Sequence, residues 1–381
     1  MDMKAIFRFG LIALAALAMS SCAKETVVDQ VDPDTPIEFG TYLGRAAQTK
    51  GSVATLDAAT VGLQTTGFGV YAFYTEDKEY ATFQTTPTAP NFMVNQKVTY
   101  GTAWTYTPVK YWPNETSHKV SFFAYAPYYQ PTTPAPTENI TSVSSNTKEG
   151  NPTLTFAVAS DVTNQKDLLF ATSPNLTKPA VNAPTKFTFK HALARIGFKA
   201  NVLVDVINED ENGEDDDSNK GNGNLASETT VTINSIKLTG NFHTNGTLDL
   251  TDGTWTSTPS AEKVDYVLSA SDLTAAKTLT TTEPSGLLNT DSEYMMIIPA
   301  DAIPMSVTVD YDVTTTDAAL NTGSSIINNV ITSDIFNFKF DQGKAYTFVL
   351  HLGLKSVELT VEEVTAWDDQ SNDAVNVPKL Q

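Results

Sequence analysis

The side chains that could do chemistry in this 381-residue chain are scattered rather than grouped. Its four histidines lie far apart, each within or beside a strand-like pattern: His118, His191, His243 and His351. The sequence contains no HExxH, GxSxG or P-loop motif and no paired Cys/His spacing, so no common metal, phosphate or acyl-transfer site is indicated. Composition does not decide on a Ser/His/Asp triad, because a triad is recognised by its geometry. We therefore expect no enzymatic activity and no cofactor.

The single cysteine, Cys22, has a sequence context that gives it a role. It cannot form an intramolecular disulfide, and it ends the stretch "ALAMSSC", which follows Lys4, Arg8 and an apolar run. A short apolar run with a basic flank and small residues at its end is typical of an export signal. The position resembles a bacterial lipobox, with Met19 in place of the usual leucine. We predict a lipoprotein signal peptide over residues 1–21 and fatty acylation, such as by palmitate, at Cys22; the alternative is an ordinary signal peptide.

Carboxylates crowd one segment, residues 208–224, among glycines and asparagines. Calcium prefers several hard oxygen ligands. The candidate ligands are Asp210, Glu214, Asp215 and Asp217. Because the regular spacing of a calcium loop is missing, the pattern favours a solvated hairpin loop, with calcium binding as the alternative.

Aromatic residues concentrate between positions 104 and 129, and could stack on sugars. The block consists of Trp104, Tyr106, Tyr111, Trp112, Tyr125, Tyr128 and Tyr129. Most of them are expected to pack in a core, because aromatic side chains bury large areas. Tyr128 and Tyr129 follow Pro127 in a loop-like stretch, so we expect these two to be exposed and able to contact a glycan.

The composition indicates a folded, acidic protein. The net charge is −20, 41% of the residues are hydrophobic and 18% are charged. Such a surface repels phosphates and anionic headgroups, which argues against nucleic-acid binding and against a peripheral membrane role. The apolar and aromatic content is sufficient for a core.

The elements that must position these residues read as strands. Short segments rich in β-branched and aromatic residues recur, including "FGVYAFYT" (68–75), "KVSFFAYAP" (119–127), "PTLTFAVAS" (152–160) and "AYTFVLHLGL" (345–354). The phase of "TVTINSIKL" slips by one residue, which predicts a bulge near Asn234 or Ser235. One short helix is expected within 269–279, behind Ser271 or Asp272. The pattern predicts an all-β protein made of β-sandwiches.

The length and a proline-rich break suggest two domains. Residues 22–36 are polar and read as a tether. The stretch "SPNLTKPAVNAPTK" separates two strand-dense halves. We expect an N-terminal sandwich over residues 37–184 and a C-terminal sandwich over 185–381.

Several blocks occur in an order that is similar to the fimbrillin-like proteins of Bacteroidetes. The resemblance covers about residues 37–369 and is carried by "FGVYAFYT", "WTYTPVKYWPN", "VSFFAYAPY", "FTFKHALARIGFKA", "YMMIIPAD", "GKAYTFVLHLGL" and "VTAWDD". It implies two transthyretin-like Greek-key β-sandwiches in tandem. It also implies export as an outer-membrane lipoprotein and assembly with other subunits into a surface pilus that supports adhesion.

The resemblance further implies that a trypsin-like protease cuts behind the first strand, and that a strand of another subunit fills the opened groove. Here a strand over residues 37–43 precedes Arg45, the candidate cleavage site, and Lys50, the second candidate. An uncut loop arginine is the alternative. The alternating segment from Val357 is the expected donor strand. The competing function is that of a monomeric surface lipoprotein that binds glycans.

Overall fold

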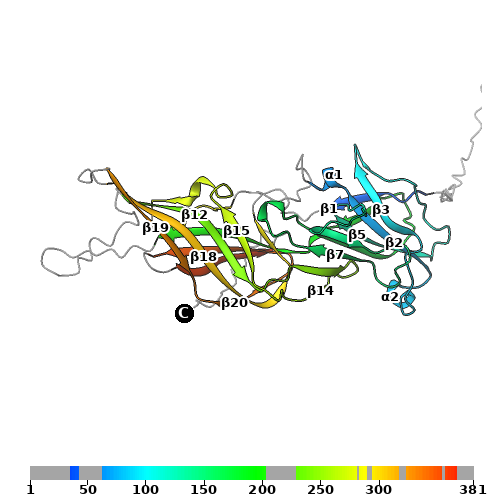
Figure 1. Ribbon diagram of the computed structural model, residues 1–381. Coiled ribbons are helices and arrows are strands. Elements are labelled where there is room, and N and C mark those ends of the chain that lie inside the picture. The colour runs from blue at the N-terminus through cyan, green and yellow to red at the C-terminus, as the bar shows by residue number, and fades with distance from the viewer. Residues whose placement is uncertain are drawn as a thin grey trace, which may run out of the picture. The chain divides into compact units, whose positions relative to one another are not determined.

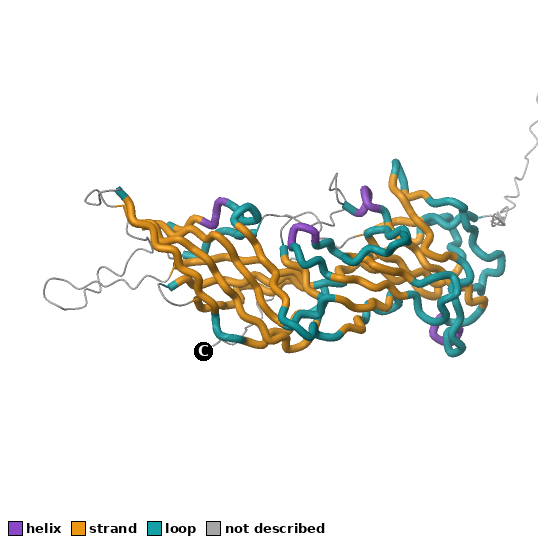
Figure 2. Tube along the Cα trace, viewed as in Figure 1, coloured by secondary structure: helices purple, strands orange, loops and turns teal. Residues whose placement is uncertain are grey.

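The computed structural model describes residues 35–42, 62–202, 229–280, 283–289, 294–316, 323–353 and 357–366. Within these ranges the protein consists of β-strands and a few short helical turns (Figures 1 and 2). The turns are α1 (Leu63–Thr66), α2 (Tyr80–Phe83) and the 3-10 turns η1 (Val162–Asn164) and η3 (Ala275–Lys277). No helix in the described part of the chain is long and apolar enough to cross a membrane. The all-β prediction is confirmed.

A six-stranded sheet forms the centre of the first half of the chain. In spatial order its strands are β10 (Lys190–His191), β8 (Leu169–Thr177), β5 (Lys119–Ala126), β2 (Phe68–Glu76), β3 (Met93–Tyr100) and β4 (Trp104–Thr105). β5 pairs in antiparallel fashion with both β2 and β8, and Figure 1 shows β2 and β5 side by side.

Both faces of this sheet are buried. Successive side chains of a strand point to opposite faces, and in β5 Val120 and Phe122 belong to one hydrophobic cluster while Phe123 and Tyr125 belong to another. Continuous burial from Phe68 to Phe73 in β2 and from Val120 to Ala126 in β5 follows from this arrangement. The sheet therefore needs a covering layer on each side.

The first face is covered by the smaller cluster, which includes a two-stranded parallel sheet of β1 (Phe39–Tyr42) and β9 (Thr185–Thr188). The second face belongs to the larger cluster, to which two strands contribute Ile140, Leu154 and Phe156. These strands, β6 (Asn139–Val143) and β7 (Thr153–Ala157), lie in a four-stranded sheet with β13 (Asn245–Asp249) and β14 (Trp255–Ser257).

Two further sheets form the rest of the second half. One has the order β17 (Met295–Ile297), β11 (Ala194–Val202), β21 (Lys344–Leu352) and β22 (Val357–Ala366). The other has the order β15 (Val264–Ser269), β12 (Thr229–Gly240), β18 (Ala300–Thr316) and β19 (Ser324–Thr332). In that sheet β16 (Thr278–Leu279) also pairs with β12, and β20 (Phe336–Phe340) with β18.

Two local sequence predictions meet different outcomes. The pairing of β12 with β18 shifts register between Ile233 and Ser235, so the predicted bulge is confirmed. The predicted helix within 269–279 is only the 3-10 turn η3, and its cap is Thr274 rather than Ser271 or Asp272. Asp272 instead accepts the backbone N–H of Ser269 at 2.7 Å, which closes the preceding turn.

Strands from both halves of the chain share one sheet. β7 of the first half pairs with β13 of the second, from Asn245 opposite Ala157 to Asp249 opposite Thr153. In addition β9 and β10, which follow the expected boundary at 184/185, pair with β1 and β8. The chain thus completes the layers of its first half with strands that lie beyond the proline-rich break.

Candidate functional site

The most unusual structural element is the first strand, which is short and yet held from two sides. At its start, the N–H of Ile37 donates to the carbonyl oxygen of Lys110 at 2.8 Å, and the N–H of Trp112 donates to that of Thr35 at 3.0 Å. Further along, β1 pairs in parallel with β9, with Phe39 opposite Thr185. Backbone bonds therefore tie residues 35–42 to two segments distant in sequence.

Side chains fix the same strand. The hydroxyl of Tyr106 donates to the carbonyl oxygen of Ile37 at 2.8 Å, and the indole N–H of Trp104 donates to Oγ1 of Thr41 at 3.0 Å. Both aromatic residues pack against the smaller cluster. Their rings thus serve as packing surface and their polar atoms bind the strand, as expected for aromatic residues with a polar handle.

The buried face of the strand is apolar. Ile37 is 1% exposed and Phe39 is 5% exposed, while Glu38 between them is exposed. The Phe39 ring lies 5.4 Å from that of Phe187 and 5.8 Å from that of Phe122, centroid to centroid. This alternation confirms that Ile37 and Phe39 point into the core. Leu43 lies outside the described residues.

Loss of this strand would uncover part of one face of the six-stranded sheet. Burial of a large apolar side chain is worth about 1.5–3 kcal/mol, and two such side chains lie on β1. The backbone groups of β9 and of residues 110–112 would also lose their partners. A replacement strand would have to supply both the apolar side chains and the hydrogen bonds.

Several residues predicted as sites fall outside the described ranges. They are Cys22, Arg45, Lys50 and the acidic residues Asp210, Glu214, Asp215 and Asp217. The strand that precedes Arg45 ends at Tyr42. Among the side chains that the structure describes, no group of three or more His, Cys, Asp or Glu is placed to hold a metal ion.

The expected donor strand is already paired within the same chain. β22 begins at Val357 as predicted, and it pairs with β21 along its whole length, from Val357 opposite Leu352 to Ala366 opposite Lys344. Val357 and Leu359 are both 7% exposed. In the sheet order β22 is an edge strand, so one of its sides is not paired to any other described strand.

Tyr128 and Tyr129 differ from the sequence expectation, because both are half-buried rather than exposed. The Tyr129 hydroxyl donates to the carbonyl oxygen of Thr141 at 3.1 Å, and its ring packs against the larger cluster. The Tyr128 hydroxyl donates to Gln130 at 2.8 Å, and Nζ of Lys97 lies 5.1 Å from the centre of its ring. The sequence after Pro127 is typical of a loop, and it gave no indication of these contacts.

Two of the histidines contact an aspartate or a serine, in two separate pairs. Nδ1 of His191 lies 2.6 Å from Oδ2 of Asp167 in a buried pair, and Nδ1 of His243 lies 2.7 Å from Oγ of Ser257. The two pairs share no residue. Burial lowers the pKa of His243 from its ordinary value. His191 lies in β10, and His243 lies in the connection between β12 and β13.

Comparison with known proteins gives a consistent result. A family model described as Fimbrillin-like matches residues 58–367. The fimbrium subunit Fim1C of Phocaeicola vulgatus is 26% identical over 405 residues, covering 97% of this chain and 98% of that protein. The crystal structure of a fimbrial protein from Bacteroides vulgatus is 22% identical, with a TM-score of 0.66, and covers 87% of this chain and 99% of that one. At this identity the structural match concerns the fold.

Proposed function

The chain belongs to the fimbrillin-like family, and from this membership we propose that it is a structural subunit of a surface fimbria that supports cell adhesion. The family is one of structural proteins, not of enzymes. The similarity to a named fimbrium subunit over nearly the full length of both chains supports this function. Its partners are then other fimbrial subunits at the cell surface.

We propose further that the fold is a tandem of two transthyretin-like Greek-key sandwiches. The several sheets of the described residues support sandwich domains. Because β9 and β10 pair with strands of the first half, we place the change between the domains after His191 rather than at 184/185.

Assembly by strand exchange is the mechanism that we propose for this subunit. The observation that carries it is the seat of β1, where Ile37 and Phe39 are buried on one face of the sheet. Basic residues follow this strand in sequence, at Arg45 and Lys50. A trypsin-like protease that cuts there would separate the strand from the body of the protein. The strand's effective concentration would fall, and a strand of another subunit could then take its place.

The donor in this mechanism is the C-terminal segment that begins at Val357. Its edge position supports this role, since an edge strand can leave its sheet by breaking a single ladder. Alternating side chains such as Val357 and Leu359 fit a groove that accepted Ile37 and Phe39. The donor must leave β21 before it can enter the neighbour.

Membrane attachment before assembly is proposed to occur through Cys22. Acylation there, followed by the polar tether of residues 22–36, would hold the subunit at the outer membrane. The motivation is the position of this one cysteine at the end of an export signal.

Limited proteolysis tests the function. We expect trypsin, added under native conditions, to cut near Arg45 and to produce a ladder of polymers on a denaturing gel run without boiling. N-terminal sequencing of the product locates the cut. A protein that keeps its first strand and stays monomeric would contradict the proposal and support the alternative, a monomeric glycan-binding surface lipoprotein.

A further inference from the structure

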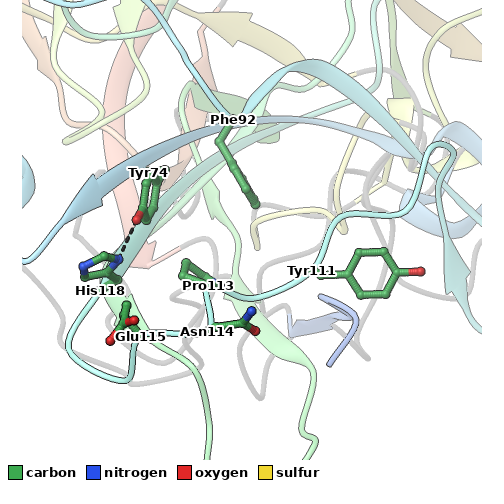
Figure 3. Close-up of a pocket in the computed structure, with 7 residues that line it drawn as sticks. All are labelled: Tyr74, Phe92, Tyr111, Pro113, Asn114, Glu115 and His118. Carbon is green, nitrogen blue, oxygen red and sulfur yellow. Dashed lines mark hydrogen bonds between the residues drawn. The ribbon is translucent and has the colours of Figure 1, made fainter. Parts of the chain in front are cut away.

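A small pocket lies at one end of the six-stranded sheet, where β2 ends and β3 and β5 begin, beside the entry of the first strand (Figure 3). Its volume is about 260 Å³. The lining comes from the end of β2, the residue before β3 and the segment that leads into β5: Tyr74, Phe92, Tyr111, Pro113, Asn114, Glu115 and His118. Of these residues only Tyr111 touches the first strand's segment, through its isolated bridge with Pro36.

The pocket combines rings with polar groups. Tyr74, Phe92 and Pro113 supply apolar surfaces, and Figure 3 shows Tyr111 at one side of the pocket with its ring turned away from the other labelled side chains. Asn114 and Glu115, both exposed, supply an amide and a carboxylate on the same segment. Tyr111 is 49% exposed, so its ring is accessible to a ligand at the rim of the pocket.

The lining is ordered before any ligand arrives. Asn91 brackets Tyr74, since its Oδ1 accepts the Tyr74 N–H at 2.8 Å and its Nδ2 donates to the Tyr74 carbonyl oxygen at 2.9 Å. The Tyr74 hydroxyl is hydrogen-bonded to Nδ1 of His118, and the N–H of His118 donates to the carbonyl oxygen of Glu115 at 3.0 Å. A site held in this way loses little freedom when it binds.

The N-terminal segment holds the wall that carries Tyr111. Pro36 forms an isolated bridge with Tyr111, and the residues on either side of Tyr111, Lys110 and Trp112, bond the backbone of Ile37 and Thr35. Nζ of Lys110 also lies 5.5 Å from the centre of the Phe92 ring, which links the two aromatic walls.

We propose that this pocket binds one neutral sugar residue, such as the terminal hexose or N-acetylhexosamine of a glycan. Aromatic rings can cover the apolar face of a sugar, while the Asn114 amide and the Glu115 carboxylate bond its hydroxyl groups. The seven lining residues include a carboxylate but neither lysine nor arginine, and the chain carries a net charge of −20. Both facts disfavour an anionic sugar. Tyr128 and Tyr129, the glycan contacts expected from the sequence, do not line this pocket. Sugar binding here does not require that the protein polymerise.

Saturation-transfer NMR on the intact chain tests the proposal. The probes are glucose, galactose, mannose, fucose, N-acetylglucosamine and N-acetylgalactosamine, with N-acetylneuraminic acid as the anionic comparison. We expect at least one neutral sugar to bind, and Tyr111→Ala and Glu115→Gln each to weaken it at least tenfold. Tyr100→Ala is the matched control, because Tyr100 is also an exposed tyrosine, at 38%, but does not line the pocket. It should bind like the unaltered protein.

Three results would overturn the proposal. The first is that none of the neutral sugars binds at 20 mM or below, a range that covers weak single-sugar sites on the order of millimolar dissociation constants. The second is that Tyr111→Ala and Glu115→Gln, shown by circular dichroism to be folded, bind as well as the Tyr100→Ala control. The third is a preference for N-acetylneuraminic acid.

Discussion

The ring of Phe39 stacks on the ring of Phe187, with their centroids 5.4 Å apart and their planes inclined by 23°. Phe39 comes from β1, near the start of the described chain, and Phe187 from β9, the strand with which β1 pairs in parallel. The stacked rings lie in the cluster that covers one face of the six-stranded sheet. The first strand is therefore part of the core, although it is only four residues long.

Substitution of Phe39 should destabilise the protein strongly. Phe39→Ala removes a ring that also contacts Phe68, Tyr106 and Phe122, and large-to-small changes of this kind cost about 3–5 kcal/mol. The measurement is the free energy of unfolding from urea denaturation. Glu38→Ala is the control, because Glu38 is exposed and surface changes stay within about 0.5 kcal/mol. Equal losses in both variants would contradict a core role for the first strand.

The buried pair of Asp167 and His191 should be a second point of sensitivity. Their side chains are 1% and 6% exposed, and Oδ1 of Asp167 also accepts the N–H of Leu168 at 2.8 Å. Asp167→Ala removes the carboxylate that contacts His191 and accepts the N–H of Leu168, and loss of a hydrogen-bond partner in a buried site costs about 1–3 kcal/mol.

The comparison for this pair is Lys119 with Glu79, which are 2.7 Å apart but much more exposed. Glu79→Ala should lower the free energy of unfolding by no more than about 1 kcal/mol. If Asp167→Ala and Glu79→Ala lowered the free energy of unfolding equally, the buried pair would contribute no more to stability than the exposed one.

The strand content was predictable because it is encoded locally. Alternation in "AYTFVLHLGL" puts Tyr346, Phe348, Leu350 and Leu352 on one face of a strand, and all four are buried; the phase slip correctly located the bulge in β12. For β1, the burial of its side chains was predictable and its pairing partner was not. Burial of Ile37 and Phe39 follows from period 2, but the parallel partner β9 does not, because pairing between distant strands has no local sequence signal.

The sheet shared by β7 and β13 was missed for the same reason, and so was the pocket. The walls of the pocket come from segments around Tyr74, Phe92 and Tyr111, which are distant in sequence and which only the fold brings together. Conversely, a loop-like sequence suggested that Tyr129 is exposed, whereas its hydroxyl reaches the backbone of Thr141. Tertiary contacts decided this position, not local propensity.

Mild acid should destabilise the folded protein through two histidines. Burial lowers the pKa of His243, and burial, partly opposed by Glu358, lowers that of His351. Below the ordinary value of 6.5 the unfolded chain therefore binds more protons at these positions than the folded protein. The stability that these two side chains contribute is present above pH 6.5 and is lost as the pH falls from 6.5 through the lower pKa values that they have in the folded protein.

Urea denaturation at pH 7.5, 6.5 and 5.5 measures this effect. Asp161 and Asp312 do not interfere, because their pKa values are lowered from 3.8, below this window. In the double variant His243→Gln/His351→Gln the decrease between pH 7.5 and 5.5 should be smaller. An unchanged pH dependence in the double variant would assign the decrease to other groups.

Replacement of Cys22 should release the protein from membranes. Cys22→Ser removes the thiol that would carry the lipid, so labelling by an alkyne fatty acid should disappear and the protein should move to the soluble fraction. Met19→Leu is the control, since it keeps the cysteine and restores the usual residue of the motif. Labelling that persists in Cys22→Ser would show that the lipid is attached at another residue.

The double variant Arg45→Ala/Lys50→Ala tests the assembly mechanism itself. Without a basic residue behind the first strand, a trypsin-like protease has no cut to make there. Residues 35–42 would then stay linked to the body and keep their place against β9 and Lys110. A tethered strand has a high effective concentration, so a strand from a neighbour could not displace it.

We therefore expect a folded, exported monomer that forms no ladder after protease treatment. The control is Lys148→Ala, which removes an exposed lysine in another loop and should leave the ladder intact. The free energy of unfolding of the double variant should match that of the uncut protein, because neither substitution touches the buried Ile37 or Phe39. Polymers that form from the double variant while its first strand is still attached would mean that subunits associate through a different surface, and release of β1 would then have no part in assembly.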